Sequence, residues 1–137
     1  MKIKLIPFKE ELITPTRAHY NDAGIDCYAQ EDFILCGGKM VKIDLGFGLE
    51  IPNGYVGLIM PRSSMNAKGI ITQLGVIDSG YNGEIKAVFI NTQLFESFEF
   101  NKGDKLCQIV ILPIAICDLV LELGEERGTG GFGSTGK

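Results

Sequence analysis

Short segments in which apolar and polar residues alternate run through most of this chain, and glycine, proline or asparagine separates them. The clearest is residues 41–45, Val-Lys-Ile-Asp-Leu, in which every second residue is apolar. Such alternation predicts strands with one buried face, and the close spacing leaves no room for helical crossovers between parallel strands. We therefore predict an all-β fold of about ten strands, a jelly roll or a Greek-key barrel.

The expected strands cover residues 1–6, 25–29, 33–35, 40–45, 47–51, 55–60, 84–89, 94–100, 105–112 and 114–123. One segment, residues 62–69, suits a short helix, with Ser63 or Ser64 as its N-cap and Gly69 as its C-terminal stop. A helix that begins beside Arg62 and two hydroxyl groups can hold an anion. A capped surface helix without a ligand is the alternative for this segment.

Residues 75–84, with the sequence GVIDSGYNGE, predict a tight β-hairpin. Apolar residues lead in, turn residues follow, and alternation resumes at Ile85. The tip would carry the carboxylate of Asp78 and the ring of Tyr81, while Gly80 and Gly83 allow a ligand to approach the backbone. Taken alone, the segment favours an ordinary β-turn without a functional role.

The length of 137 residues and a hydrophobic content of 45% indicate one globular domain. A net charge of −4 and a pI near 5.0 argue against a nucleic-acid partner but allow a small anion carried with a metal ion. No apolar run is long enough to span a bilayer, so no membrane partner is expected. Arg62 and Arg127 lie in serine- or glycine-rich stretches, where a guanidinium suits phosphate.

The four cysteines have no CxxC spacing, and no signal peptide is evident, so we expect buried thiols of a cytoplasmic protein. His19 is the only histidine, which argues against a zinc site built from side chains. Residues 124–137 contain six glycines. We therefore expect a core over residues 1–123 and a mobile, glycine-rich C-terminal lid over residues 124–137.

Five stretches, taken in order, resemble the five motifs of the trimeric dUTP diphosphatases (dUTPases). They are residues 23–26 (AGID), 61–64 (PRSS), 75–83 (GVIDSGYNG), 102–108 (KGDKLCQ) and 127–136 (RGTGGFGSTG). The resemblance implies a homotrimer of jelly rolls that shares its active sites between subunits. The implied reaction is hydrolysis of dUTP to dUMP and pyrophosphate by attack of water on the α-phosphate, which limits uracil in DNA and supplies dUMP for thymidylate synthesis.

The resemblance also implies roles for individual residues. Asp78 matches the carboxylate that activates water, Gln108 the amide that holds water and the α-phosphate, and Asp26 a carboxylate that holds Mg²⁺ through water. The residues expected to bind substrate are Arg62, Ser63, Ser64, Gly75, Val76, Ile77, Tyr81, Lys86, Arg127, Phe132, Gly133, Ser134 and Thr135.

Specificity is expected from the hairpin. Backbone groups near Gly75, Ile77 and Lys86 cannot exchange donor and acceptor roles, so cytosine would leave them unpaired. Tyr81 would exclude a ribose 2′-hydroxyl and Phe132 would stack on uracil. Whether Thr72 or Gln73 also contacts the base is left open by the sequence.

Two other functions compete with this one. dCTP deaminases share the PRSS and hairpin patterns, but a deaminase needs a proton-shuttling glutamate where this chain has Val88. A nucleotide-dependent binding protein is the second alternative, and nothing in the sequence marks its partner.

Overall fold

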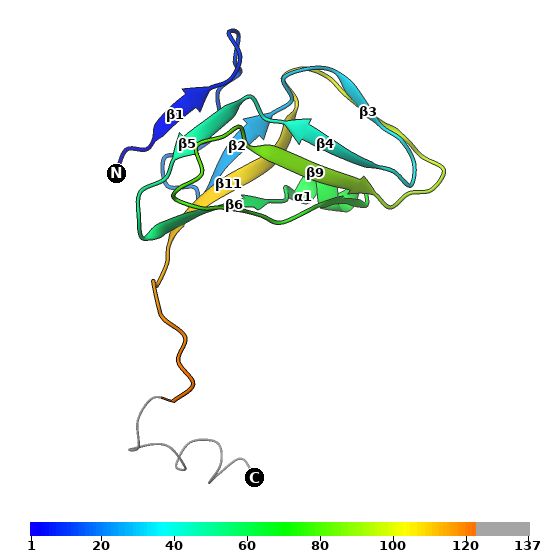
Figure 1. The fold of residues 1–137 in the computed structure, drawn as a ribbon. Coiled ribbons are helices and arrows are strands. Elements are labelled where there is room, and N and C mark those ends of the chain that lie inside the picture. Colours follow the sequence, from blue (N-terminus) through cyan, green and yellow to red (C-terminus); the bar gives the residue numbers. More distant parts are fainter. Residues whose placement is uncertain (123–137) are drawn as a thin grey trace, which may run out of the picture.

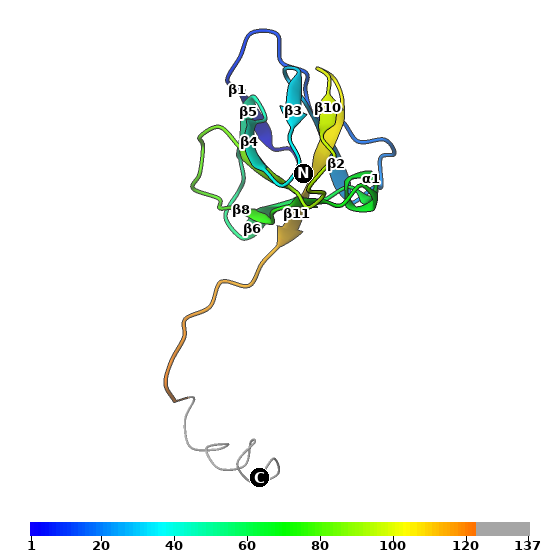
Figure 2. The same ribbon diagram turned by 90° about the vertical axis from the view of Figure 1, so that its right-hand side faces the viewer.

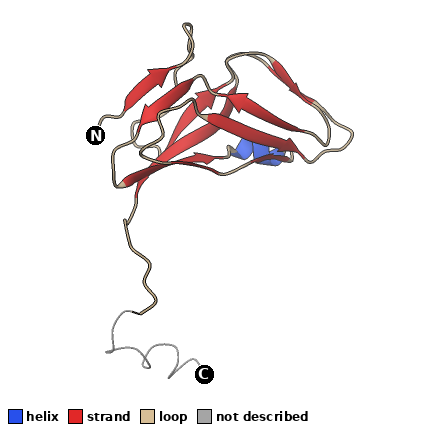
Figure 3. Ribbon diagram, in the orientation of Figure 1, coloured by secondary structure: helices blue, strands red, loops and turns tan. Residues whose placement is uncertain are grey.

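The computed structural model describes residues 1–122, which form eleven strands and one short helix (Figures 1 and 3). The all-β prediction is therefore confirmed. The strands are β1 (Lys4–Pro7), β2 (Gly24–Tyr28), β3 (Phe33–Leu35), β4 (Met40–Asp44), β5 (Phe47–Glu50), β6 (Tyr55–Met60), β7 (Ile70–Thr72), β8 (Gly75–Ile77), β9 (Lys86–Asn91), β10 (Phe98–Phe100) and β11 (Lys105–Pro113), and the helix is α1 (Ser63–Ala67).

The strands pair in four antiparallel groups. The two larger sheets have the orders β2-β11-β6-β8 and β4-β9-β7, and two pairs, β1-β5 and β10-β3, complete the body. Alternation in the sequence matches alternation in burial: in β9, Ala87, Phe89 and Asn91 are buried and the residues between them are not. This pattern places one continuous apolar core between the sheets.

Two of the four cysteines belong to that core. Cys27 of β2 and Cys107 of β11 are fully buried and lie opposite each other across the two strands. The hydrogen bond with Cys107, together with burial, raises the pKa of the Cys27 thiol well above its usual range. The expectation of buried thiols is wrong for Cys36 and Cys117, which are exposed; all four are free.

The predicted hairpin of residues 75–84 does not form. β8 pairs with β6, whereas β9 pairs with β4 and β7, so the two arms belong to different sheets. The alternation that predicts each arm is present, but a local pattern does not specify which neighbour a strand will pair with. Residues 78–85 therefore form a loop that crosses between two sheets.

The helix begins differently from the prediction. Arg62, with extended backbone, is its N-cap, and neither Ser63 nor Ser64 caps it, since both lie inside the helix. The predicted stop is correct: Gly69 has φ +78°, a left-handed conformation that favours glycine and ends the helix.

The strand expected over residues 114–123 is also absent from the described part of the chain. After the backbone N–H of Ile114 donates to Gly54 (2.8 Å), residues 114–122 run away from the body without regular structure (Figures 1 and 2). Leu119 is 94% exposed and Leu121 fully exposed. We call residues 114–122 the arm. The lid predicted over residues 124–137 lies outside the described residues.

No helix among the described residues is long and apolar enough to cross a membrane.

Candidate functional site

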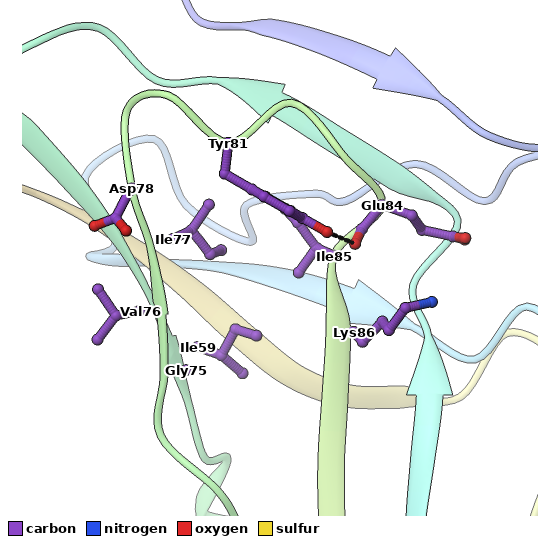
Figure 4. Close-up of a pocket in the computed structure, with 9 residues that line it drawn as sticks. All are labelled: Ile59, Gly75, Val76, Ile77, Asp78, Tyr81, Glu84, Ile85 and Lys86. Carbon is purple, nitrogen blue, oxygen red and sulfur yellow. Dashed lines mark hydrogen bonds between the residues drawn. The ribbon is translucent and has the colours of Figure 1, made fainter.

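A pocket of about 270 Å³ opens where β8 and β9 separate (Figure 4). Because β8 is the edge strand of its sheet, the backbone groups on its outer side have no strand partner and are available to a ligand. Six of the residues that line this pocket are expected site residues: Gly75, Val76, Ile77, Asp78, Tyr81 and Lys86. Three further residues, Ile59, Glu84 and Ile85, complete its lining.

The loop over residues 78–85 is held by its own hydrogen bonds. The backbone N–H of Tyr81 donates to the carbonyl of Asp78 (3.0 Å), which closes a turn, and the Tyr81 hydroxyl donates to the carbonyl of Glu84 (2.7 Å, Figure 4). A Cβ at Gly83 would lie 2.7 Å from the Tyr81 hydroxyl. Glycine at this position therefore lets the Tyr81 side chain fold back along the loop, where it forms one wall of the pocket.

Two charged side chains of this region reach away from the pocket toward β4 and β5. The Glu84 carboxylate accepts from the backbone N–H of Gly46 (3.0 Å), and Lys86 Nζ donates to Asp44 (2.6 Å). The hydrogen bond with Asp44 raises the pKa of Lys86. Sequence reasoning missed Glu84, because its partner is 38 residues away.

Asp78 is exposed and lies across the pocket from Lys86 (Figure 4). The neighbouring Ser79 donates to Asn53 (3.2 Å), which ties this side of the loop to the connection between β5 and β6. A carboxylate at the mouth of a pocket, on a loop held at both ends, can orient a water molecule toward a ligand in the pocket.

A second group of polar residues gathers where β2, β11 and the start of α1 meet. Asp26 lies 3.3 Å from Lys105 Nζ and 3.7 Å from Arg62 Nε. Arg62 Nη1 also donates to Ser64 Oγ (3.1 Å) and to the Lys105 carbonyl (3.4 Å). We call Asp26, Arg62, Ser64, Lys105 and Gln108 the Asp26 cluster.

Gln108 lies directly opposite Asp26 in the β2–β11 pair and opposite Met60 in the β11–β6 pair. Its Nε2 donates to the carbonyl of Pro61 (2.9 Å). A polar amide in so apolar a strand needs a hydrogen-bond partner, and the Pro61 carbonyl provides one. With two cations and one carboxylate, the Asp26 cluster carries a net charge of +1 and suits an anion such as phosphate.

The pocket and the Asp26 cluster lie apart in the same sheet. Gln108 is level with Met60 of β6, whereas Ile77, the last residue of β8, is level with Gly57. Asp78 is thus separated from Gln108 by two strand spacings across the sheet and by four residues along the strands. Together these correspond to a distance of roughly 15 Å. One chain therefore does not bring its Asp78 and Gln108 to the same reacting atom.

Other expected site residues are placed as follows. Ser63 is exposed at the start of α1. Thr72 is buried, and its hydroxyl has no hydrogen-bond partner among the described residues, while Gln73 is exposed. Lys105 was not predicted, since its pairing with Asp26 depends on the β2–β11 register. Arg127, Phe132, Gly133, Ser134 and Thr135 lie outside the described residues.

Comparisons with known proteins agree with one another. A sequence model of the dUTPase family matches residues 10–136. The chain is 43% identical to a deoxyuridine 5′-triphosphate nucleotidohydrolase of Clostridium tetani over 143 aligned positions, covering 100% of this chain and 97% of the relative. It is 36% identical to the protein of that name from Corynebacterium jeikeium, covering 98% and 92%.

Solved structures give the same result. A point mutant of the dUTPase of phage phi11 of S. aureus, described with a structural Mg(II) ion, superposes with a TM-score of 0.83 at 26% identity, over 93% of this chain and 99% of that one. A point mutant of the dUTPase of Staphylococcus bacteriophage 80alpha, solved with dUpNHpp, gives 0.81 at 27% identity, over 99% of both chains.

Proposed function

This chain belongs to the dUTPase family and hydrolyses dUTP to dUMP and pyrophosphate, and we propose that each active site is assembled from different subunits of a homotrimer. The family's jelly-roll fold is the fold described above. The observation that carries the proposal is the separation of Asp78 from the Asp26 cluster within one chain. Both halves serve one reaction only if a neighbouring copy places its Asp26 cluster at this chain's pocket.

Two apolar surfaces support assembly of several copies. The arm exposes Ile116, Leu119 and Leu121. A groove of about 440 Å³ runs between the β1–β5 pair and the β2–β11 pair, lined by Met1, Ile3, Leu5, Pro15, Arg17, Ile25, Phe47, Leu49, Ile109 and Ile111. An apolar arm and an apolar groove on one small domain are typical of a chain that associates with its own copies.

In the assembled site, the pocket holds deoxyuridine and Asp78 acts as the general base. Asp78 orients a water molecule and accepts its proton as the water oxygen bonds to the α-phosphorus. The bond between that phosphorus and the oxygen bridging to the β-phosphorus breaks, so that pyrophosphate leaves and dUMP remains. The exposed carboxylate of Asp78 at the mouth of the pocket suits this step.

The Asp26 cluster of the neighbouring subunit would hold the phosphate chain. Arg62, Ser63 and Ser64 would donate to phosphate oxygens, and the Gln108 amide would hold the α-phosphate and the attacking water. Lys105 adds a second cation next to Arg62. In the tail, Arg127, Ser134 and Thr135 would bind the terminal phosphates, while Phe132 and Gly133 would cover the base.

The residues present fit a magnesium ion that arrives with the substrate. The Asp26 carboxylate is already paired with two cations, and no group of three or more potential metal ligands gathers among the described residues. Asp26 would therefore hold Mg²⁺ through bound water, in keeping with the preference of that ion for its waters and for substrate phosphates. When bound, the ion neutralises charge that develops on the phosphate oxygens.

Specificity for deoxyuridine would come from the geometry of the pocket. The unpaired edge of β8, at Gly75, Val76 and Ile77, offers fixed backbone groups that complement the edge of uracil and not that of cytosine. Tyr81, fastened to the Glu84 carbonyl, would pack against the deoxyribose and leave no space for a 2′-hydroxyl.

The test is pyrophosphate release from dUTP, dCTP, dTTP and UTP by the full-length protein with Mg²⁺. We expect kcat/KM for dUTP to exceed that for dCTP and UTP by at least about 1,000-fold. Cytosine would leave backbone groups of β8 unpaired, and the 2′-hydroxyl of UTP would meet the Tyr81 ring. Release of ammonia from dCTP would instead support the deaminase alternative.

Deleting residues 124–137 tests the roles assigned to the tail. We expect kcat/KM for dUTP to fall about 100-fold, because several donors to the terminal phosphates are lost together. The thermal unfolding midpoint should stay near that of the full-length protein, since the strands and core lie within the described residues. A truncated protein as active as the full-length one would contradict the lid.

A further inference from the structure

Gly24, which the mechanism above does not use, lies against the carboxamide of Gln108. It is the first residue of β2, two residues before Asp26, and pairs with Val110 of β11. A Cβ at Gly24 would overlap Oε1 of Gln108 and would lie only 2.7 Å from its Cδ. Any side chain at position 24 would therefore occupy the space that the Gln108 amide fills.

Two contacts define how this amide lies. The Pro61 carbonyl can only accept, so the nitrogen of the amide must face it, at 2.9 Å. With its nitrogen so fixed, the amide presents Oε1 toward Gly24. It keeps one N–H and the carbonyl oxygen for a ligand. The position of the Gln108 amide thus depends on the Pro61 carbonyl on one side and on the missing side chain of Gly24 on the other.

We propose that Gly24 is a positioning residue for dUTP hydrolysis, because the absence of a side chain lets the Gln108 amide lie across β2 beside Asp26. The inference rests on the proposed role of Gln108 in holding the α-phosphate and the water. The backbone of Gly24 does not have the left-handed conformation that requires glycine. Alanine can therefore adopt the same backbone, and the flexible end of Gln108 is the group that must move.

The test is a double-mutant cycle of Gly24→Ala and Gln108→Ala, with kcat and KM for dUTP measured for each variant. We expect Gln108→Ala to lower kcat about 100-fold, as removal of one transition-state donor does. Gly24→Ala should lower kcat about 10-fold to 50-fold with KM changed less than about threefold. In the Gln108→Ala background, Gly24→Ala should cause no further loss, because the two changes act through the same amide.

Gly37→Ala is a control for a close contact placed elsewhere, with backbone in place of a flexible side chain. A Cβ there would lie 2.5 Å from the Leu94 carbonyl, outside both the pocket and the Asp26 cluster, so it perturbs packing without touching the amide. We expect its kcat to equal that of the unmodified protein. The side-chain amide of Gln108 gives a second readout: its nitrogen-15 NMR resonance should shift in Gly24→Ala and not in Gly37→Ala.

Each outcome separates this inference from the proposed function. Unchanged kcat in Gln108→Ala would refute the role of Gln108 itself. Loss in Gln108→Ala with full activity in Gly24→Ala, or losses that multiply in the double variant, would overturn the role of Gly24 alone. If Gly24→Ala does not fold, the folding of the double variant tests the inference. Restored folding in the double variant supports a clash confined to the Gln108 amide, and continued misfolding contradicts the proposed role of Gly24.

Discussion

Replacing Asp78 with asparagine should lower kcat for dUTP hydrolysis by about 1,000-fold, the size of effect that loss of a general base produces. Asparagine keeps the shape of the side chain and one oxygen that can orient water, but it cannot accept the proton of the attacking water. Binding of dUMP should change little, because the pocket walls are formed by Tyr81 and the backbone of β8. Pyrophosphate release under single-turnover conditions measures the loss directly.

Asp32→Asn serves as the control for that experiment. Asp32 is a carboxylate outside the pocket and the Asp26 cluster that accepts from the backbone N–H of Lys102 (2.7 Å), and asparagine keeps an acceptor there. It should retain full activity and stability. Appreciable hydrolysis by Asp78→Asn, with dUMP bound as before, would show that some other group activates the water.

Mixing two inactive variants should restore activity if each site draws its halves from different chains. One parent carries Asp78→Asn, and the other carries Arg62→Ala together with Gln108→Ala, so each parent should retain only about 0.1% of normal activity. In trimers assembled at random from equal amounts, a site receives an intact pocket half of the time and an intact Asp26 cluster half of the time. About one quarter of the sites should then be intact.

Co-expression of the two chains with different affinity tags, followed by purification on both, gives the mixed trimers. Their dUTP hydrolysis should reach a substantial fraction of normal activity, hundreds of times that of either parent. Co-expression of two differently tagged copies of the Asp78→Asn chain is the control and should stay inactive. Mixed trimers no more active than their parents would place both halves of the site within one chain.

Local sequence pattern predicted the strands well where one face is buried. Residues 55–60 form β6 with the predicted bounds, and alternation from Val41 to Leu45 corresponds to β4. Gln108 is visible in the sequence as a single amide within an apolar strand, although its partner Pro61 is 47 residues away. These features depend on a residue's own neighbours in the chain, which the sequence displays.

Features that depend on distant pairing were missed. The Asp26–Lys105 and Glu84–Gly46 contacts join residues far apart in the chain, and they follow from strand registers that no local pattern specifies. For the same reason the segment around Asp78 was predicted as a closed hairpin, whereas its arms pair elsewhere and leave a pocket between them. Six of the nine residues that line that pocket were predicted as site residues, whereas its shape was not predicted.

The exposed arm has a consequence for how the protein matures. Leu119 and Leu121 are exposed among the described residues, so in the proposed trimer a newly synthesised subunit carries exposed apolar surface until it meets other copies. Completion of the proposed trimer then requires association of separate molecules, and the rate of that step rises with protein concentration. In the proposed trimer, folding and quaternary assembly are successive stages of one process.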